Sequence, residues 1–303
     1  MPPTPGHAVR TFALFAVAAS ASAVVVMAVA PMVSAVAQGR SPDANSLTSP
    51  PSSNPSPSTD PSPAGSASPS PSPSPSPSPT PTPTGKSFKG AAAVGALFTA
   101  SKGKLRHFCT AAVVQSKHGD LAITAAHCMI GRQLGPNSKV MFAPGYHDGK
   151  FPYGKWVVRK SFVDRNWRLH LNPNDDVAFL LVGKPGQKVQ KRTGGERLET
   201  NYTLPQTVTV IGYPDSTNLP ITCTGPARRL HLKGYRQMVF DCGHYTDGTS
   251  GGPFLIPATK TRPAKVIGVI GGYQAGGDTP SISYSPIFIG NVAALFKRAN
   301  TYS

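Results

Sequence analysis

The chain has 303 residues, and its 30 lysines and arginines outnumber its 13 aspartates and glutamates, which gives a formal net charge of +17 at neutral pH. Before residue 86 only Arg10 and Arg40 are basic and only Asp43 and Asp60 are acidic, so the surplus lies in the later part of the chain. This surplus suits an anionic cell-wall or membrane surface as partner. No dense Lys/Arg run with interleaved aromatic residues occurs, which argues against a specific nucleic-acid site and favours a diffusely basic, soluble surface.

Residues 1–37 have the features of an export signal. His7 and Arg10 precede a charge-free apolar stretch over 11–36, and the small residues of "VSAVAQG" form a cleavage site after Ala37. The stretch is also long enough to remain as a membrane anchor. In both cases the positive flank stays inside. We therefore expect an exported chain, either secreted or tethered to the membrane or cell wall.

Residues 38–87 form a low-complexity spacer in which proline alternates with serine or threonine, as in "SPSPSPSPSPSPTPTPT". Such a segment buries no apolar surface and adopts extended polyproline conformations. At about 3 Å per residue it spans on the order of 100 Å. We expect no catalytic group in it.

Residues 88–303 have the composition of a globular domain. The apolar runs are short, rich in valine, isoleucine and phenylalanine, and separated by turn residues, which predicts an all-β barrel or sandwich. We expect strands in 93–99, 108–114, 121–126, 139–143, 155–163, 177–183, 207–213, 237–241, 253–256 and 265–272. The exception is "NVAALFKRAN", 291–300, which predicts a terminal helix with Asn291 as candidate N-cap.

Four cysteines occur, and in an exported chain they meet an oxidising compartment in which they should pair. Of the three pairings that four cysteines allow, we favour Cys109–Cys128 and Cys223–Cys242, each of which links neighbouring segments. Neither a CxxC motif nor a clustered His/Cys spacing supports the competing use as a metal site. We expect no metal or cofactor.

A glycine-rich turn, "HYTDGTSGGPFLI" at 244–256, carries two adjacent hydroxyls, Thr249 and Ser250. Covalent acyl transfer needs a nucleophilic oxygen, a base, a group that fixes the base's tautomer, and donors for the oxyanion. Gly248 allows backbone N–H groups to turn inward, and the two glycines after Ser250 allow a close approach of the chain to a substrate. By itself the motif fits a plain glycine-rich hairpin equally well.

A candidate base and a candidate carboxylate occur upstream of this turn. His127 follows the apolar run 121–126 beside Cys128, although a lone histidine near a disulfide is more often structural. Asp175 and Asp176 directly precede the apolar run "VAFLLVG", where an Asn/Asp turn is also common. Asp176 adjoins the run and is the better placed of the two to point inward.

The motifs "HFCTAAVV…LAITAAHC", "DDVAFLLV" and "DGTSGGPF" resemble, in this order, the three catalytic motifs of the chymotrypsin-like (trypsin-like) serine peptidases, in the style of secreted bacterial members. The order His, Asp, Ser is the order of that family. The resemblance covers roughly residues 93–290 and excludes the leader and the spacer. It implies two six-stranded antiparallel β-barrels with the site in the crevice between them, to which we add the C-terminal helix.

Matched residue by residue, the resemblance implies His127 as general base, Asp176 as the carboxylate that orients it, and Ser250 as nucleophile. It implies the N–H groups of Gly248 and Ser250 as the oxyanion hole. It also supports the Cys109–Cys128 disulfide, which would hold the histidine loop.

The specificity pocket follows the family less closely. His244, Tyr245 and Thr246 precede the serine turn where the family lines this pocket, and Gly271 and Gly272 are expected in the opposite wall. These residues define neither an acidic nor a plainly apolar pocket floor.

Further departures concern activation. Thr249 stands where digestive members have an aspartate that pairs with a newly released amino terminus, and "FKGAAAVGALF" lacks the usual Ile/Val-Val-Gly-Gly start. We therefore expect no switch of this kind. His107 resembles a family neighbour of the cleft, and we interpret it as structural.

These features together predict a monomeric, exported serine endopeptidase that hydrolyses protein or peptide substrates through an acyl-enzyme. Two alternatives stay open. An inactive peptidase-like domain could bind a cell-wall polymer or protein through its basic surface, and the same triad could serve an esterase.

Overall fold

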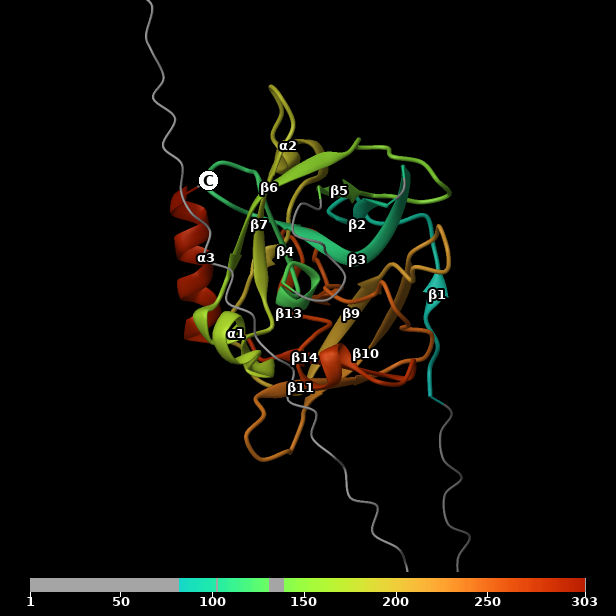
Figure 1. The fold of residues 1–303 in the computed structure, drawn as a ribbon. Coiled ribbons are helices and arrows are strands. Elements are labelled where there is room, and N and C mark those ends of the chain that lie inside the picture. The colour runs from blue at the N-terminus through green and yellow to red at the C-terminus, as the bar shows by residue number, and fades with distance from the viewer. Residues whose placement is uncertain (1–81, 102, 131–138, 303) are drawn as a thin grey trace, which may run out of the picture. The chain divides into compact units, whose positions relative to one another are not determined.

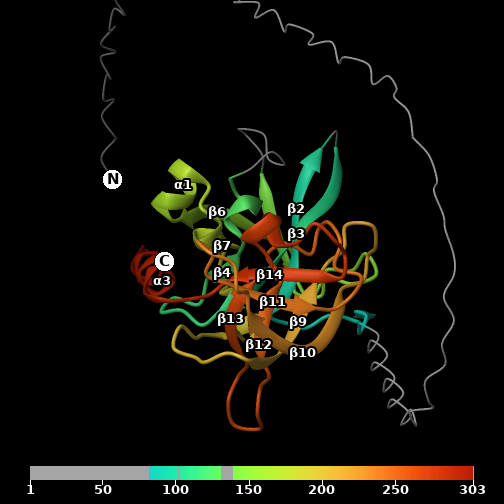
Figure 2. The same ribbon diagram turned by 90° about the horizontal axis from the view of Figure 1, so that it is seen from below.

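The computed structural model describes residues 82–101, 103–130 and 139–302 (Figure 1). The expected export signal and nearly all of the expected spacer lie outside these residues. The described part consists of two β-structures, one from each half of the domain, with helix α3 packed on one side (Figures 1 and 2).

Six strands of the first half close into a barrel in the order β2–β3–β4–β7–β6–β5, with antiparallel pairing all around the ring. Leu97, Phe142 and Phe179 come from three of these strands and are fully buried in the core. The first of the two expected barrels is thereby confirmed. Its strands are Val94–Ser101 (β2), Lys104–Val114 (β3), Leu121–Thr124 (β4), Val140–Pro144 (β5), Trp156–Val163 (β6) and Ala178–Gly183 (β7).

The second β-structure is a curved, half-barrel sheet of eight strands. Seven come from the second half, in the order β14–β11–β10–β9–β12–β13–β8, and β1, from the start of the described chain, pairs with β10. Its strands are Lys86–Ser87 (β1), Arg197–Leu198 (β8), Gln206–Gly212 (β9), Ile221–Arg229 (β10), Gln237–Asp241 (β11), Pro253–Ile256 (β12), Lys265–Val269 (β13) and Ile282–Pro286 (β14). The all-β class with two barrel-like halves is therefore as expected.

The second half departs from a six-stranded antiparallel barrel in two respects. Between β13 and β14 a side chain takes the place of a backbone acceptor, because Val269 N donates to Ser285 Oγ at 2.9 Å. Gly271 N then donates to Tyr284 O at 3.0 Å. In addition, β8 pairs with β13 in parallel.

Four strands, β1, β8, β10 and β14, were not expected from the sequence. β1 and β8 are two residues long, and β10 contains Gly225 and Pro226, which weaken the sequence signal for a strand. β1 continues a contact that begins in the expected spacer, since Gly85 N donates to Gly243 O at 2.9 Å. The last residues before position 88 therefore take part in the fold.

Helix α3, Gly290–Tyr302, confirms the expected terminal helix. It buries Val292, Leu295 and Ala299, spaced as one helical face, and packs against β6 and β7. The N-cap prediction for Asn291 is wrong: the helix begins one residue earlier, and Asn291 lies in its first turn. There its Nδ2 donates to Asp175 Oδ1 at 2.5 Å.

The shorter helices are α1, Arg165–His170, and α2, Val189–Thr193, together with 3₁₀ turns at Ala126–Cys128 (η1), Pro173–Asp175 (η2) and Tyr273–Gly276 (η3). Within the described ranges, none of the helices has the length and apolar character needed to cross a membrane. Both expected disulfides, Cys109–Cys128 and Cys223–Cys242, are present.

Candidate active site

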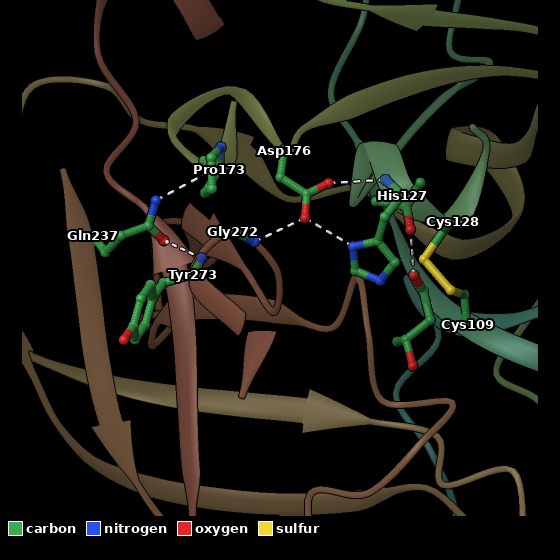
Figure 3. Close-up of polar contacts among 10 residues, drawn as sticks. Cys109, His127, Cys128, Pro173, Asp176, Gln237, Gly272 and Tyr273 are labelled. Carbon is green, nitrogen blue, oxygen red and sulfur yellow. Dashed lines mark hydrogen bonds and ion pairs between the residues drawn. A yellow bond between two sulfur atoms is a disulfide. The ribbon is translucent and has the colours of Figure 1, made fainter. Parts of the chain in front are cut away.

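His127 lies at the end of a short, rigid segment of the first barrel. The preceding strand β4 is buried at every position, and η1 places His127 between the buried Ala126 and Cys128. The disulfide from Cys128 to Cys109 on β3 fastens this turn to the barrel (Figure 3). The backbone of His127 is therefore fixed in place, while its imidazole stays partly exposed.

Asp176 is completely buried and accepts three hydrogen bonds (Figure 3). Its Oδ1 accepts from the backbone N of His127 at 2.8 Å, and its Oδ2 lies 2.8 Å from His127 Nδ1. Oδ2 also accepts from Gly272 N at 2.8 Å. Since a carboxylate accepts at both oxygens, the proton of the neutral imidazole sits on Nδ1 and leaves Nε2 as acceptor.

Asp176 also raises the pKa of His127. Burial by itself lowers the pKa of His127, but the negative charge of Asp176 and its hydrogen bond raise it more, so the pKa lies above its ordinary value. A general base with a raised pKa is neutral, and therefore competent, only at higher pH.

Ser250 lies in the turn between Asp247 and β12. Thr110, on β3 of the first barrel, holds this turn in place. Thr110 N donates to Ser250 O at 2.7 Å, and Thr110 Oγ1 donates to Gly248 O at 3.0 Å. Thr110 Oγ1 also accepts from Tyr213 N at 2.9 Å. One buried threonine of the first barrel thus fixes the serine turn of the second half.

At Gly248 and Gly251 of this turn, neighbouring atoms leave no room for a side chain. Gly251 has φ of +80°, and a Cβ there would collide with Thr124 Oγ1 and Thr110 O. At Gly248, with φ of +89°, a Cβ would come within 2.5 Å of Tyr213 O and Asp215 N. The turn is therefore packed directly against both halves of the domain.

The two adjacent hydroxyls of the turn have different surroundings. Thr249 is buried and donates to Thr246 O at 2.6 Å. Ser250 is partly exposed and lines the same cavity as His127, a cavity of about 530 Å³. Among the described residues Ser250 Oγ has no hydrogen-bond partner, so its hydroxyl is available to a molecule in the cavity.

The backbone N–H groups of Gly248 and Ser250 likewise donate to no group of the described chain, whereas the neighbouring N–H of Thr249 donates to Thr246 O at 3.1 Å and that of Gly251 to Ile270 O at 2.7 Å. Two unused donors beside a candidate nucleophile are the arrangement that an oxyanion requires.

The cavity wall differs in part from the one expected. Tyr245 and Thr246 line it, whereas His244, Gly271 and Gly272 do not. Gly271 and Gly272 lie instead against the carboxylate of Asp176 and the side chain of Gln237. The opposite wall is formed by Ile270 and the segment 275–280, and further lining residues are Asp215, Ser216, Asp247 and Thr249.

The missed part of the wall has a weak sequence signal. Gln274, Ala275, Gly276 and Gly277 all have positive φ, so "QAGG" folds as an irregular turn rather than as a continuation of β13. Only the pair of glycines indicates this turn in the sequence.

His107 lies outside the cavity wall. It is 8% exposed, and its Nε2 lies 3.0 Å from Thr217 O, in the loop that carries Asp215. Burial lowers the pKa of His107, and the contacts with Thr217 and Asp215 offset this only in part. These contacts agree with its interpretation as a structural residue.

Cys109, His127 and Cys128 bring potential metal-ligand atoms within 4.8 Å of one another. The two sulfur atoms are joined in a disulfide, however, and a disulfide offers no thiolate to a metal. The donor set of this group therefore does not fit a metal ion.

Gln237 is a residue that sequence reasoning missed. It is fully buried on β11, and its Nε2 donates to Pro173 O at 3.0 Å, in the turn before Asp176. Its Oε1 accepts from Tyr273 N at 3.3 Å, one residue after the Gly272 N–H that reaches Asp176 (Figure 3). The amide thus connects the two backbone segments that hold Asp176 in place.

Replacing Gln237 by methionine should keep the volume of this side chain and lose its three hydrogen bonds, those to Pro173 O and Tyr273 N and a third from Nε2 to Asn174 Oδ1 at 3.3 Å. Because the Pro173 carbonyl and the Tyr273 N–H are then left without this partner, we expect about 2–4 kcal/mol lower free energy of unfolding. Denaturant unfolding measures this loss. Gln115→Met is the matched control, since Gln115 is exposed and makes one contact, Nε2 to Gly195 O at 3.2 Å; an equal loss in both variants would contradict the prediction.

Comparison with known proteins agrees with this architecture. No protein-family model and no curated protein sequence matches the chain, but solved structures do. The protease Anisep from Arthrobacter nicotinovorans superposes with a TM-score of 0.61 at 22% identity, over 72% of this chain and all of that one. The fold is that of the chymotrypsin-like serine proteases.

Two further structures of this fold are similar. A thermostable serine protease, AL20, from an extremophilic microorganism gives a TM-score of 0.58 at 22% identity, covering 70% of this chain and 99% of its own. A Glu endopeptidase gives 0.55 at 16% identity, covering 72% of this chain and 97% of its own. The likeness concerns the two-barrel scaffold alone.

Proposed function

We propose that the protein is a serine endopeptidase with Ser250 as nucleophile, His127 as general base and Asp176 as the carboxylate that orients His127. The observation that carries this proposal is a single cavity lined by both Ser250 and His127, in which His127 Nδ1 is held by a fully buried carboxylate. A binding module needs no such alignment of three groups from three separate segments.

In this mechanism Ser250 Oγ attacks the carbonyl carbon of the scissile peptide, and its proton passes to His127 Nε2. The N–H groups of Gly248 and Ser250 stabilise the oxyanion that forms on the carbonyl oxygen. His127 then gives the proton to the leaving amine, and an acyl-enzyme remains on Ser250. Water, deprotonated by His127, hydrolyses this ester and restores the serine.

Labelling with a fluorophosphonate tests the proposal directly, because this reagent phosphonylates only an activated serine. We expect one equivalent of label on Ser250, located by peptide mapping, together with hydrolysis of a peptide-bond substrate. An unlabelled Ser250 would favour the inactive binding domain. Labelling with cleavage of esters but not of peptides would favour an esterase.

The two disulfides fit an exported protein, since such bonds persist in oxidising compartments. We propose that the enzyme acts outside the cytoplasm, on proteins or peptides, and as a monomer. The residues of the proposed triad need neither a metal ion nor a cofactor for this chemistry.

The charge of the cavity suggests which side chains the enzyme prefers. Asp215, Asp247 and Asp278 line it, and no lysine or arginine among the described residues does, although basic residues predominate in this chain. Among the described residues, none of these three carboxylates forms an ion pair with a lysine or arginine of the chain. A cationic side chain is therefore the complementary occupant, and an anionic one is repelled.

We accordingly expect peptides with lysine or arginine at the cleavage position to exceed the glutamate analogue in kcat/KM by at least about 100-fold. The preference that the name of the Glu endopeptidase states would then not extend to this chain. A fluorogenic peptide library measures the ratio. The double variant Asp215→Asn with Asp278→Asn should lower this kcat/KM ratio. Asp241→Asn, which removes a carboxylate outside the cavity, should leave the ratio unchanged. A library that favours glutamate would contradict the prediction.

A further inference from the structure

A second cavity lies on the first barrel, away from the residues of the candidate active site. It has a volume of about 460 Å³ and is lined from β6, α1 and α3. Lys160, Arg165, Arg168 and Arg298 contribute to its wall, and among the described residues no aspartate or glutamate does. An adjoining hollow on α3 shares Arg298 and adds Lys297, and its described lining residues include no aspartate or glutamate.

In the described part of the chain none of these five cations forms an ion pair, although lysines and arginines elsewhere do, as in Lys188–Asp120 and Lys265–Glu199. The nearest acidic residue in sequence, Asp164, uses its side chain to cap α1 by accepting from Asn166 N at 2.7 Å. Gathering like charges in one concave surface is unfavourable unless an anionic partner offsets their repulsion.

Two of the cations are held in place by the fold. Arg298 Nη2 donates to Val163 O at 2.9 Å. Lys160 Nζ lies 3.5 Å from the ring centroid of Tyr302, a cation–π contact, and Tyr302 in turn packs edge-on against Phe162 at 5.5 Å between centroids. Lys160 and Arg298 are therefore held in position before any partner arrives.

Exposed apolar side chains accompany these charges. Leu169 and Leu171, at the end of α1, are 59% and 60% exposed, and Tyr302 on α3 is 60% exposed. Leu169 lies one helical turn after Arg165, on the same side of α1. Both views place α1 and α3 on the same side of the domain (Figures 1 and 2). We call this surface, with the five cations and the three apolar residues, the basic face.

We propose that the basic face docks on an anionic lipid surface, with its cations against lipid phosphates and Leu169, Leu171 and Tyr302 in the interfacial layer. Cations attract an anionic leaflet, and leucine and tyrosine bury area at the boundary between headgroups and acyl chains. A soluble polyanion would use the cations equally well but would gain nothing from the three exposed apolar side chains. The lipid surface is thus the partner that uses both features.

A site-specific probe tests this proposal in the full chain. The described chain has no free cysteine, so Leu171→Cys offers a single thiol there for an environment-sensitive fluorophore. On vesicles of phosphatidylglycerol and phosphatidylcholine in equal parts, the probe at position 171 should shift to shorter wavelength. It should shift little on phosphatidylcholine alone. Because the signal comes from this face, it reports docking even where the N-terminal segment itself holds the chain on the vesicle.

The β2–β3 hairpin supplies a matched control. There Leu105 is 38% exposed between Lys104 and Arg106, so it presents the same residue types on a strand across the barrel from β6. A probe at Leu105→Cys should not shift on anionic vesicles. In the chain labelled at 171, Arg165→Gln with Arg168→Gln should lower the ratio of docked to free face by roughly 30-fold, at about fivefold for each cation.

Lys104→Gln with Arg106→Gln removes the same two charges from the hairpin and should leave that ratio within about twofold. Four results would overturn the proposal: no shift at position 171 on anionic vesicles, an equal shift on phosphatidylcholine alone, an equal shift at 105, or equal losses in the two charge variants. Soluble polyphosphate that immobilises the probe while anionic vesicles leave its spectrum unchanged would assign the face to a polymer instead.

Discussion

Replacing Ser250 by alanine is expected to lower kcat for peptide hydrolysis by about 10⁶-fold, to a level near background, and to abolish fluorophosphonate labelling. The variant removes one partly exposed hydroxyl without a hydrogen-bond partner among the described residues, so nothing in the fold loses a contact. Thermal unfolding should therefore change little, and both disulfides should form as in the parent. Stopped assays on a fluorogenic peptide measure the loss, with the concentrations of parent and variant determined by absorbance.

Thr249 provides the control for this variant, because it carries the adjacent hydroxyl in the same turn. Thr249→Val keeps the shape of the side chain and removes its hydrogen bond to Thr246 O, so it should cost about 1–3 kcal/mol of stability. Its label should still be found on Ser250, and its kcat should stay within about tenfold of the parent. Cleavage by Ser250→Ala at the parent rate would refute the assignment of the nucleophile.

The contrast between these hydroxyls shows what the sequence could predict. Local motifs identify Ser250, His127 and Asp176 because each lies beside a short apolar run or a glycine turn that a strand pattern makes visible. The structure then adds the contacts by which Asp176 differs from Asp175: one accepts from His127, and the other from Asn291 on α3. Adjacent residues with the same side chain could be ranked from the sequence only by their distance from the strand.

The parts of the site that escaped prediction are contacts between distant segments. Thr110 holds the serine turn across 138 residues of sequence, and Gln237 reaches Pro173 across 64. Gln237 belongs to no motif, and Thr110 lies in the motif "HFCTAAVV" without any sign there of its contact with the serine turn, because both roles arise only when the two halves of the domain meet. The cavity wall at 275–280 was missed for a related reason: its shape follows from backbone conformations with positive φ rather than from side-chain pattern.

Replacing Asp176 by asparagine should lower kcat/KM by about 10⁴-fold while the fold is kept. Both carboxylate oxygens accept, one from the backbone N of His127 and the other from His127 Nδ1 and Gly272 N. An asparagine must turn its NH₂ group toward one of these sets of donors. If it faces His127 Nδ1, the imidazole keeps its proton on Nε2 and cannot accept the proton of Ser250.

The same variant should change the pH dependence in a defined direction. The charge and hydrogen bond of Asp176 raise the pKa of His127 above its ordinary value, so in the parent the neutral base is lost as pH falls through that raised pKa. Removing the charge leaves the burial effect, which lowers the pKa, so the residual activity of Asp176→Asn should persist to lower pH than that of the parent. The pH profile of kcat/KM measures this shift.

Asp175→Asn is the matched control, because it changes an adjacent buried carboxylate in the same turn. Its partner is Asn291 Nδ2, at 2.5 Å from Oδ1, and an asparagine there can still accept that bond through its carbonyl oxygen. We expect its kcat/KM within about tenfold of the parent and its acid limb unmoved, because no contact with His127 is altered. A loss of equal size in the two variants, or an acid limb that moves in neither, would show that Asp176 stabilises the turn without orienting the base.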